Sequence, residues 1–480
     1  MLLAALAVLT ALRLVVAAAT NLAPDEAYYW VWSRVLQPGY LDDSPMVALF
    51  IRLGTGIAGP TPLGVRLLGP LATALGSVLL WRAARDFFPH SPTVGPAAAA
   101  LINATLLFGV GSVVMTPDTP LLLFWTLGLF ALGRLLASGD GRWWWLAGLA
   151  AGLALDSKYT AILFVVAVGL WLLLSANGRP WLRRPEPWLG LLLALLLFAP
   201  VLAWNALHHW ASFLKQGGRV GAWRPAAALG FQAELLGGQI GLFTPLVFVL
   251  AVAGSGRLAA RAWREGAPAA ELLSLLTLVP AALFVQHAFG DRVQGNWPAV
   301  LYPSSLLAAA ALADPPWPGL RAPAVLLGLT ITGLVYVQAL AQPFALPVRL
   351  DPSLRALSGW GRMADRIAGI GRQDDAGFVA AGNYGEASQL AFLGRGPLPV
   401  VGAGPRWRLF RLPPAGPTIA GRIGLLLERR GAGPPDPALW TVLGPPLPLL
   451  RAWGGQVAES YLLYRVRPGR ESPGAILPGR

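Results

Sequence analysis

The sequence predicts an all-α polytopic membrane protein of about eleven transmembrane helices, followed by a small extracytoplasmic α/β domain. Residues of the set AVILMFWYC make up 55% of the 480-residue chain, and only 12% are charged, about half the usual share of a soluble domain. The apolar residues also gather in runs long enough to cross a bilayer as helices. This composition excludes a disordered chain, a coiled coil and a nucleic-acid-binding domain. The net charge of +14 fits basic loops facing an anionic membrane surface.

Eleven apolar runs are expected to span the membrane. They cover residues 2–20, 63–81, 92–110, 117–136, 143–156, 159–175, 187–206, 236–255, 268–289, 296–313 and 321–341. The first run has one alternative, a signal peptide ending near Ala17-Ala18-Ala19. No basic residue precedes this run and Arg13 interrupts it, which favours a span.

The arginines predict the orientation of these helices. With a cytoplasmic N-terminus, eleven of them fall in short inner loops, as the positive-inside rule requires. They are Arg82, Arg85, Arg134, Arg142, Arg179, Arg183, Arg184, Arg257, Arg261, Arg264 and Arg321. The sequence thus predicts a multi-pass protein of a bacterial inner membrane, with its active site and C-terminus on the periplasmic side.

Two domains are expected. Residues 1–348 form the membrane domain, which includes a long outer loop at 21–62, and residues 349–480 form the α/β domain. Within the loop, Met46–Ile51 is apolar but too short to span, so we expect an interfacial helix there. In the tail, β-prone runs such as Gly377-Phe378-Val379-Ala380 indicate strands.

With this topology the polar landmarks gather at the outer surface. They are Asp25-Glu26, Asp42-Asp43, Thr116-Pro117-Asp118, Asp156-Ser157-Lys158, His208-His209 and Asp291-Arg292. A one-sided collection of acids and cations favours an enzyme at the membrane interface. A transporter or flippase of a lipid-linked sugar, the alternative, would place such groups near the midplane and show repeat symmetry.

The segment from Asp25 to Trp30 is the most informative. A carboxylate just beyond a membrane helix can act as a general base, which makes Asp25 a candidate catalytic residue. Glu26, Tyr28 and Tyr29 would bind substrate, although an acidic loop anchored by interfacial aromatics explains the segment equally well.

Lys158 is expected to bind a lipid phosphate as a point charge; a snorkelling lysine or a partner for Asp156 is the alternative. The outer-loop residues Arg219 and Arg292 would assist, although each also fits an ordinary surface cation. Besides Lys158, the chain has one lysine, Lys215.

A metal site has weak support. His208 and His209, with Asp42 or Asp43, offer nitrogen and oxygen ligands, but no spacing rule joins them, and interfacial histidines beside Trp210 fit better. The chain has no cysteine, which excludes a thiolate site. Thr116-Pro117-Asp118-Thr119-Pro120 is best explained as a helix start.

At these residues the sequence resembles the GT-C glycosyltransferases. The segments that carry the resemblance are Asp25–Trp30, Gly39–Ala48, Thr116–Pro120, Ser157–Thr160, His209–Phe213, Gly295–Ala299, Gly359-Trp360 and Asn383–Phe392. The branch resembled is the bacterial family 39/83 type, related to protein O-mannosyltransferases and to the aminoarabinose transferase acting on lipid A. The resemblance covers nearly the whole chain in order.

The resemblance implies a GT-C fold, a polyprenyl-phosphate sugar donor, inversion at the sugar carbon and an acceptor lipid, glycan or protein outside the membrane. It maps the family's first-loop acidic residue onto Asp25. It places Asp42, Asp43 and His209 among the substrate-binding residues and requires no cofactor, because a polyprenyl phosphate is itself a good leaving group. The partners expected are therefore the donor, the acceptor and membrane lipids, without nucleic acid. One departure concerns Asp43-Ser44-Pro45, where the family often has His-Pro-Pro, so a histidine contact there is lost.

Overall fold

The structure is a computed structural model that describes residues 2–218, 223–471 and 473–480. The chain forms two compact units. The membrane unit contains Met1–Leu14, Asp42–Val47 and Leu68–Leu334, and the sheet unit contains Val15–Leu41, Ala48–Leu67 and Val335–Arg480. The division into domains at residues 348 and 349 stays a prediction.

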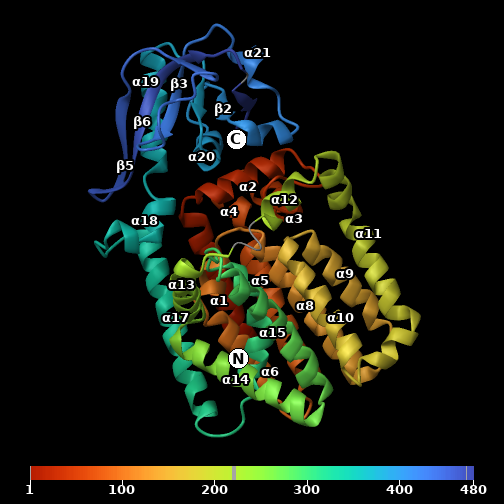
Figure 1. Cartoon of the computed structure of the whole chain (residues 1–480). Helices are drawn as coiled ribbons and strands as arrows, with labels where there is room; N and C mark the ends of the chain where they lie inside the picture. Colours follow the sequence, from red (N-terminus) through yellow and green to blue (C-terminus); the bar gives the residue numbers. More distant parts are fainter. Residues whose placement is uncertain (1, 219–222, 472) are drawn as a thin grey trace. The chain divides into compact units, whose positions relative to one another are not determined.

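Helices make up the membrane unit and the parts of the sheet unit that come before residue 68 (Figure 1). They are α1 (Leu2–Ala19), α2 (Pro24–Arg34), α3 (Met46–Ala58), α4 (Pro62–Arg66), α5 (Leu68–Phe87), α6 (Val94–Asn103), α7 (Leu106–Gly111), α8 (Asp118–Ser138), α9 (Trp143–Leu155), α10 (Ile162–Leu174), α11 (Pro185–Leu207), α12 (Ala211–Gly217), α13 (Pro225–Phe243), α14 (Pro245–Glu265), α15 (Pro268–His287), α16 (Tyr302–Ala310) and α17 (Trp317–Ala341), with 3₁₀ turns η1 (Tyr159–Ala161), η2 (Arg179–Arg183) and η3 (Trp297–Leu301).

The polytopic helical fold is confirmed. In the described part of the chain, seven helical segments are long and apolar enough to cross a membrane: Leu2–Ala19, Pro62–Phe87, Asp118–Ser138, Pro185–Leu207, Pro245–Glu265, Pro268–His287 and Trp317–Ala341. Shorter apolar helices lie at Met46–Ala58, Val94–Asn103, Trp143–Leu155 and Tyr159–Leu174. The total of eleven spans stays a prediction.

Three expected spans do not form single α-helices: residues 92–110 are divided between α6 and α7, residues 296–313 between η3 and α16, and residues 236–255 between α13 and α14. Residues 236–255 do not form one helix, because α13 ends at Phe243 and α14 begins at Pro245. Pro245 has no N–H to continue the hydrogen-bond ladder, and a proline disfavours the helical conformation of the residue before it. Thr244 accordingly has φ 71° and ψ 144°.

The charge inside the first helix has a side-chain acceptor in the membrane unit. Arg13 is fully buried, and its Nη1 donates to Oδ1 of Asn103 over 2.7 Å. The amide of Asn103 in turn donates to Oγ of Ser77 at 2.8 Å. A buried guanidinium needs such acceptors, so the interruption of the apolar run is compatible with a helix at 2–19.

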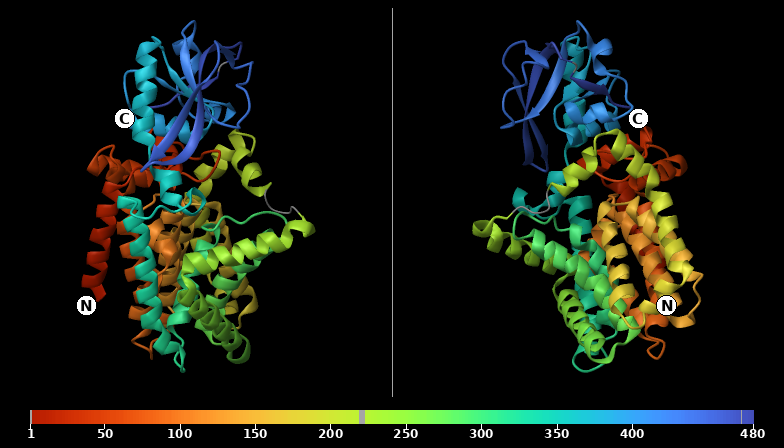
Figure 2. Two further views of the ribbon diagram at one scale, coloured as in Figure 1. Left: turned by 90° about the vertical axis from the view of Figure 1, so that its left-hand side faces the viewer. Right: turned by 45° about the vertical axis from the view of Figure 1, so that its right-hand side comes forward.

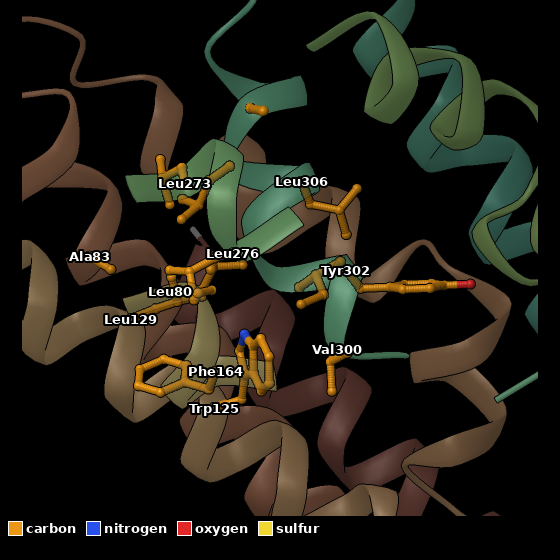
Figure 3. Packing of buried hydrophobic residues seen from close by; sticks show 14 of the residues in the cluster. Leu80, Ala83, Trp125, Leu129, Phe164, Leu273, Leu276, Val300, Tyr302 and Leu306 are labelled. Carbon is orange, nitrogen blue, oxygen red and sulfur yellow. The ribbon is translucent and has the colours of Figure 1, made fainter. Parts of the chain in front are cut away.

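The core of the membrane unit lies between α5, α8, α9, α10, α15 and α16. Leu80, Leu129, Leu276 and Leu306 are fully buried there, and Trp125 packs edge-to-face on Phe164 at 5.2 Å between ring centroids (Figure 3). Small residues bring helices close: a Cβ added to Gly148 of α9 would lie 2.1 Å from the Gly190 carbonyl oxygen of α11. Such contacts are typical of helices packing in membranes.

The sheet unit adds a mixed sheet to α2, α4 and the surrounding segments. Its remaining elements are η4 (Val348–Leu350), α18 (Pro352–Leu357), α19 (Trp360–Gln373), β1 (Val379–Ala381), α20 (Tyr384–Leu393), β2 (Val400–Ala403), η5 (Pro405–Leu409), α21 (Ala415–Ile419), β3 (Gly424–Arg429), β4 (Trp440–Val442), β5 (Leu447–Trp453), β6 (Gln456–Pro468) and β7 (Gly474–Ile476). The α/β character predicted for the tail is therefore confirmed.

The strand order is β4-β6-β3-β1-β2-β7, with β5 also paired to β6. Strand β1 runs parallel to β2 and β3 and is buried along its length, which fits its apolar sequence. The β5–β6 hairpin, dark blue in Figure 2, turns at Gly454 and Gly455 with φ of 55° and 78°. Two successive positive φ values favour glycine and match the twist of a hairpin.

Candidate active site

The predicted base, Asp25, lies in the first turn of α2. Pro24 occupies the first helical position, and the backbone N–H of Ala23 donates to Oε2 of Glu26 at 2.9 Å. A proline at this position and a carboxylate that reaches back both fix a helix start. The side chain of Asp25 is exposed, and the helix dipole favours a negative charge there. The sequence around Asp25 thus presents a carboxylate on a defined backbone.

A side chain from the tail contacts this carboxylate within the sheet unit. The hydroxyl of Tyr384 donates to Oδ1 of Asp25 at 2.8 Å. The guanidinium carbon of Arg406 lies 4.2 Å from the Tyr384 ring centroid and 5.3 Å from that of Tyr28. These distances are within cation–π range.

Glu26 lies inside the sheet unit. Its side chain and that of Arg66 are both fully buried, with Nε to Oε1 at 2.6 Å and Nη2 to Oε2 at 2.5 Å. Arg66 also donates to the carbonyl oxygens of Thr20 and Asn21 at 2.9 and 2.7 Å. The pair therefore ties the end of α1 to the start of α2. Glu26 thus stabilises the backbone on which Asp25 lies, and its direct contact with substrate stays a prediction.

The two predicted tyrosines belong to an aromatic cluster. Tyr28 is buried, 4.6 Å from Tyr384 and 5.6 Å from Trp407 between ring centroids. Tyr29 is half-buried and packs edge-to-face on Trp32 at 5.0 Å. Tyr28 thus supports the segment from within, and direct contact of either ring with substrate stays a prediction.

A second polar cluster lies in the membrane unit, around Asp42 and Asp43. Asp42 forms an ion pair with Lys215, and the side-chain amide of Gln216 donates to the Asp42 carbonyl oxygen. The Lys215 and Asp42 side chains keep 26% and 21% of their exposure. This α12 lysine is a site residue that sequence reasoning did not select.

Asp43 is buried beside Lys158 and Asp118. Burial raises its pKa to about 7, against the opposing effect of Lys158 and of the Ser44 N–H, which donates to Oδ1 at 2.9 Å. The loop is held in place because Oγ of Ser44 donates to the Leu155 carbonyl oxygen at 2.8 Å. A carboxyl with such a pKa changes its protonation near neutral pH.

Lys158 pairs with Asp118 across the same cluster. Its Nζ lies 2.7 Å from Oδ1 of Asp118, and Nδ2 of Asn296 donates to Oδ2 at 2.5 Å. Asp118 begins α8, as the helix-start prediction has it, yet its carboxylate also serves this cluster. Asp156, next to Lys158 in sequence, has its own pKa raised to about 7 by burial. Both lysines of the chain therefore sit among carboxylates, where an incoming phosphate can compete for them.

The other predicted binding residues lie elsewhere or outside the described residues. His209 and Trp210 have φ of 53° and 58° and connect α11 to α12; the side chain of His209 is exposed. Arg292 is exposed and pairs with Glu234. Arg219 lies outside the described residues.

The histidine–aspartate metal hypothesis gains no support. In residues 2–218, 223–471 and 473–480, no group of three or more His, Asp or Glu side chains is placed to hold a metal ion. His208 instead stacks on Trp204 at 4.2 Å, with Nδ1 2.7 Å from the Trp204 carbonyl oxygen.

Sequence reasoning missed four contributors: Lys215, Asn296, Tyr384 and Arg406. A signal existed for three of them. Lys215 is one of two lysines, whereas Asn296 and Tyr384 belong to segments that carry the GT-C resemblance. Arg406 is one of many tail arginines, and nothing in its local sequence distinguishes it.

Known proteins resemble this chain in sequence. Residues 42–204 match the model of the dolichyl-phosphate-mannose-protein mannosyltransferase family. The lipid A galacturonosyltransferase RgtD of Rhizobium johnstonii is 29% identical over 328 residues, which cover 66% of this chain. The chain spans 65% of the length of that relative.

Solved structures share the fold. ArnT from Cupriavidus metallidurans in the apo state has a TM-score of 0.62 at 15% identity and covers 96% of this chain and 97% of its own. The same enzyme bound to undecaprenyl phosphate has a TM-score of 0.61 at 16% identity, with 95% and 96% coverage. The chain therefore shares the fold of ArnT, in agreement with the GT-C resemblance carried by the motifs.

Proposed function

We propose that the chain is a membrane glycosyltransferase. It transfers a sugar, with inversion, from a polyprenyl phosphate to an acceptor on the outer side of the inner membrane. The observation that carries the proposal is the exposed Asp25 carboxylate at the fixed start of α2, with its neighbour Glu26 held in a buried pair. A base must be accessible to the acceptor proton, and the exposure of the Asp25 side chain supports this role.

The proposed chemistry needs one base and one anion site. Asp25 accepts the proton of the acceptor hydroxyl, whose oxygen forms a bond to the anomeric carbon of the sugar. The bond between that carbon and the phosphate oxygen breaks, and the polyprenyl phosphate leaves with the electron pair. Attack opposite the leaving group inverts the anomeric carbon.

We assign the donor phosphate to Lys158, with Lys215 nearby in the same cluster through Asp42 and Asp43. Phosphate would replace carboxylates as the partner of these ammonium groups. Asp43 supports this exchange, because its pKa of about 7 lets it take up a proton when an anion adds negative charge. No metal enters this scheme.

The names of the relatives suggest which substrates to test first. The name of RgtD includes lipid A, and one structure of ArnT is described as bound to undecaprenyl phosphate. We therefore propose a lipid A type glycolipid as the first acceptor and undecaprenyl phosphate as the carrier. For the transferred sugar, the proposal includes both hexoses and pentoses.

Purified protein in detergent tests the proposal. The protein is incubated with lipid A and undecaprenyl-phosphate sugars in the presence of EDTA, and the products are identified by mass spectrometry. A glycosylated acceptor is expected. Protein in detergent does not separate two compartments, so a transporter or flippase would yield no glycosylated acceptor. Absence of product with every donor, together with unchanged envelope lipids in cells lacking the gene, would overturn the proposal.

A further inference from the structure

We propose that Tyr384 is a positioning residue for Asp25, which makes the tail part of the catalytic machinery. The inference rests on the proposed function, because it takes Asp25 as the base. The alternative is that the tail is a separate module for binding an envelope partner, attached to the enzyme but not needed by its chemistry.

The hydrogen bond itself is the first argument. The Tyr384 hydroxyl donates to Asp25 Oδ1 at 2.8 Å, between residues 359 positions apart in sequence. An exposed carboxylate at a helix start can rotate about its side-chain bonds. A directional donor selects one orientation, and a neutral hydroxyl does so without neutralising the charge that a base needs.

The position of Tyr384 is fixed by the helix that it begins. Oδ1 of Asn383 accepts from the N–H groups of Gly385 and Glu386 at 2.9 and 3.3 Å, a standard N-cap. Tyr384 is therefore the first residue of α20, with a defined backbone rather than a place in a loose loop.

Helix α20 is also docked against the segment that carries Asp25. Nε2 of Gln389 donates to the Leu22 carbonyl oxygen at 2.6 Å. At Gly385, an added Cβ would lie only 2.7 Å from Cβ of Pro24, so glycine permits the close approach. Both contacts lie just before Asp25 in the chain and hold α20 against the segment that carries it.

Arg406 also contacts the ring of Tyr384. Its guanidinium lies over the rings of Tyr384 and Tyr28, and Nη1 donates to the Tyr28 hydroxyl at 3.2 Å. Tyr28 is itself buried one turn after Asp25 in α2. The chain of contacts from Asp25 through Tyr384 and Arg406 thus returns to α2. A closed set of this kind holds each member in one orientation.

Kinetics of the full-length protein test the inference. Tyr384→Phe keeps the ring and its contact with Arg406 but removes the hydroxyl. We expect kcat to fall about tenfold at unchanged melting temperature, with KM for donor and acceptor within about twofold of wild type. The matched control is Tyr464→Phe on β6, which removes a tyrosine hydroxyl of the same unit outside the Asp25 contacts and should keep its kcat.

A double variant tests whether Tyr384 acts through Asp25. In an Asp25→Asn background the added Tyr384→Phe change should cost no further activity, because effects that pass through one group are not additive. A wild-type kcat for Tyr384→Phe, equal losses in Tyr384→Phe and Tyr464→Phe, or full additivity in the double variant would overturn the inference alone. An inactive wild-type protein would instead overturn the proposed function, and this inference with it.

Discussion

Removal of the charge is predicted to lower turnover at Asp25 and to lower stability at its neighbour Glu26. Asp25 is exposed, so Asp25→Asn changes little in packing, and the free energy of unfolding should change by about 0.5 kcal/mol or less. Loss of a general base costs about 10²- to 10⁴-fold in rate, or roughly 2.7–5.4 kcal/mol of activation free energy. The variant should therefore fold, bind donor and turn over at least about a hundredfold more slowly.

Glu26→Gln is the matched control. Its carboxylate is fully buried against Arg66, and removing one partner of such a pair costs about 3–5 kcal/mol of stability because a buried charge is left uncompensated. This variant should lower the melting temperature clearly while the folded fraction keeps most of its turnover. The assay is kcat at saturating donor together with the thermal unfolding of each purified protein. Near-normal turnover of Asp25→Asn would refute the assignment, and Asp43 would be the next carboxylate to test.

Three further predictions concern the membrane unit and the topology. Lys158→Gln should raise KM for the donor about ten- to a hundredfold, from about 1.5–3 kcal/mol for a charge-assisted contact, and more than Lys158→Arg; a wild-type KM would leave Lys158 as a partner of Asp118 only. The pKa of Asp43 is raised to about 7 from 3.8, so its contribution to stability is present below about pH 4 and is lost as the pH rises to about 7. Melting temperatures measured from pH 4 to 8 should therefore fall less steeply for Asp43→Asn than for wild type, and identical slopes would count against this titration. A reporter fused after residue 345 should be active only outside the cytoplasm, and cytoplasmic activity would contradict the predicted orientation.

Hydropathy predicted the helical elements well because membrane helices are defined by a local property. The span expected at 117–136 corresponds to α8, at Asp118–Ser138, and the span at 187–206 to α11, at Pro185–Leu207. The prediction at 236–255 was wrong because a window average ignores the proline at 245. The restriction that a proline places on the preceding residue was readable in the sequence and identifies the break at Thr244.

The candidate site was predictable only in part. Local chemistry selected Asp25, Asp43 and Lys158, because acids and lysine are rare beside apolar spans. It could not pair Asp25 with Tyr384, since nothing in either segment encodes a contact over 359 positions. Nor could it separate Asp25 from Glu26, because their opposite exposures depend on Arg66, forty residues further along the chain.

The scarcity of lysine gives the membrane unit a built-in chemical probe. The only two side-chain amines of the protein, Lys158 and Lys215, both belong to the same cluster, and their side chains keep 12% and 26% of their exposure. Because the other basic side chains counted among Lys and Arg are arginines, the side-chain amines that an amine-reactive reagent can modify all belong to this cluster. Covalent labelling can thus follow occupancy of the cluster in the native sequence, without any engineered residue.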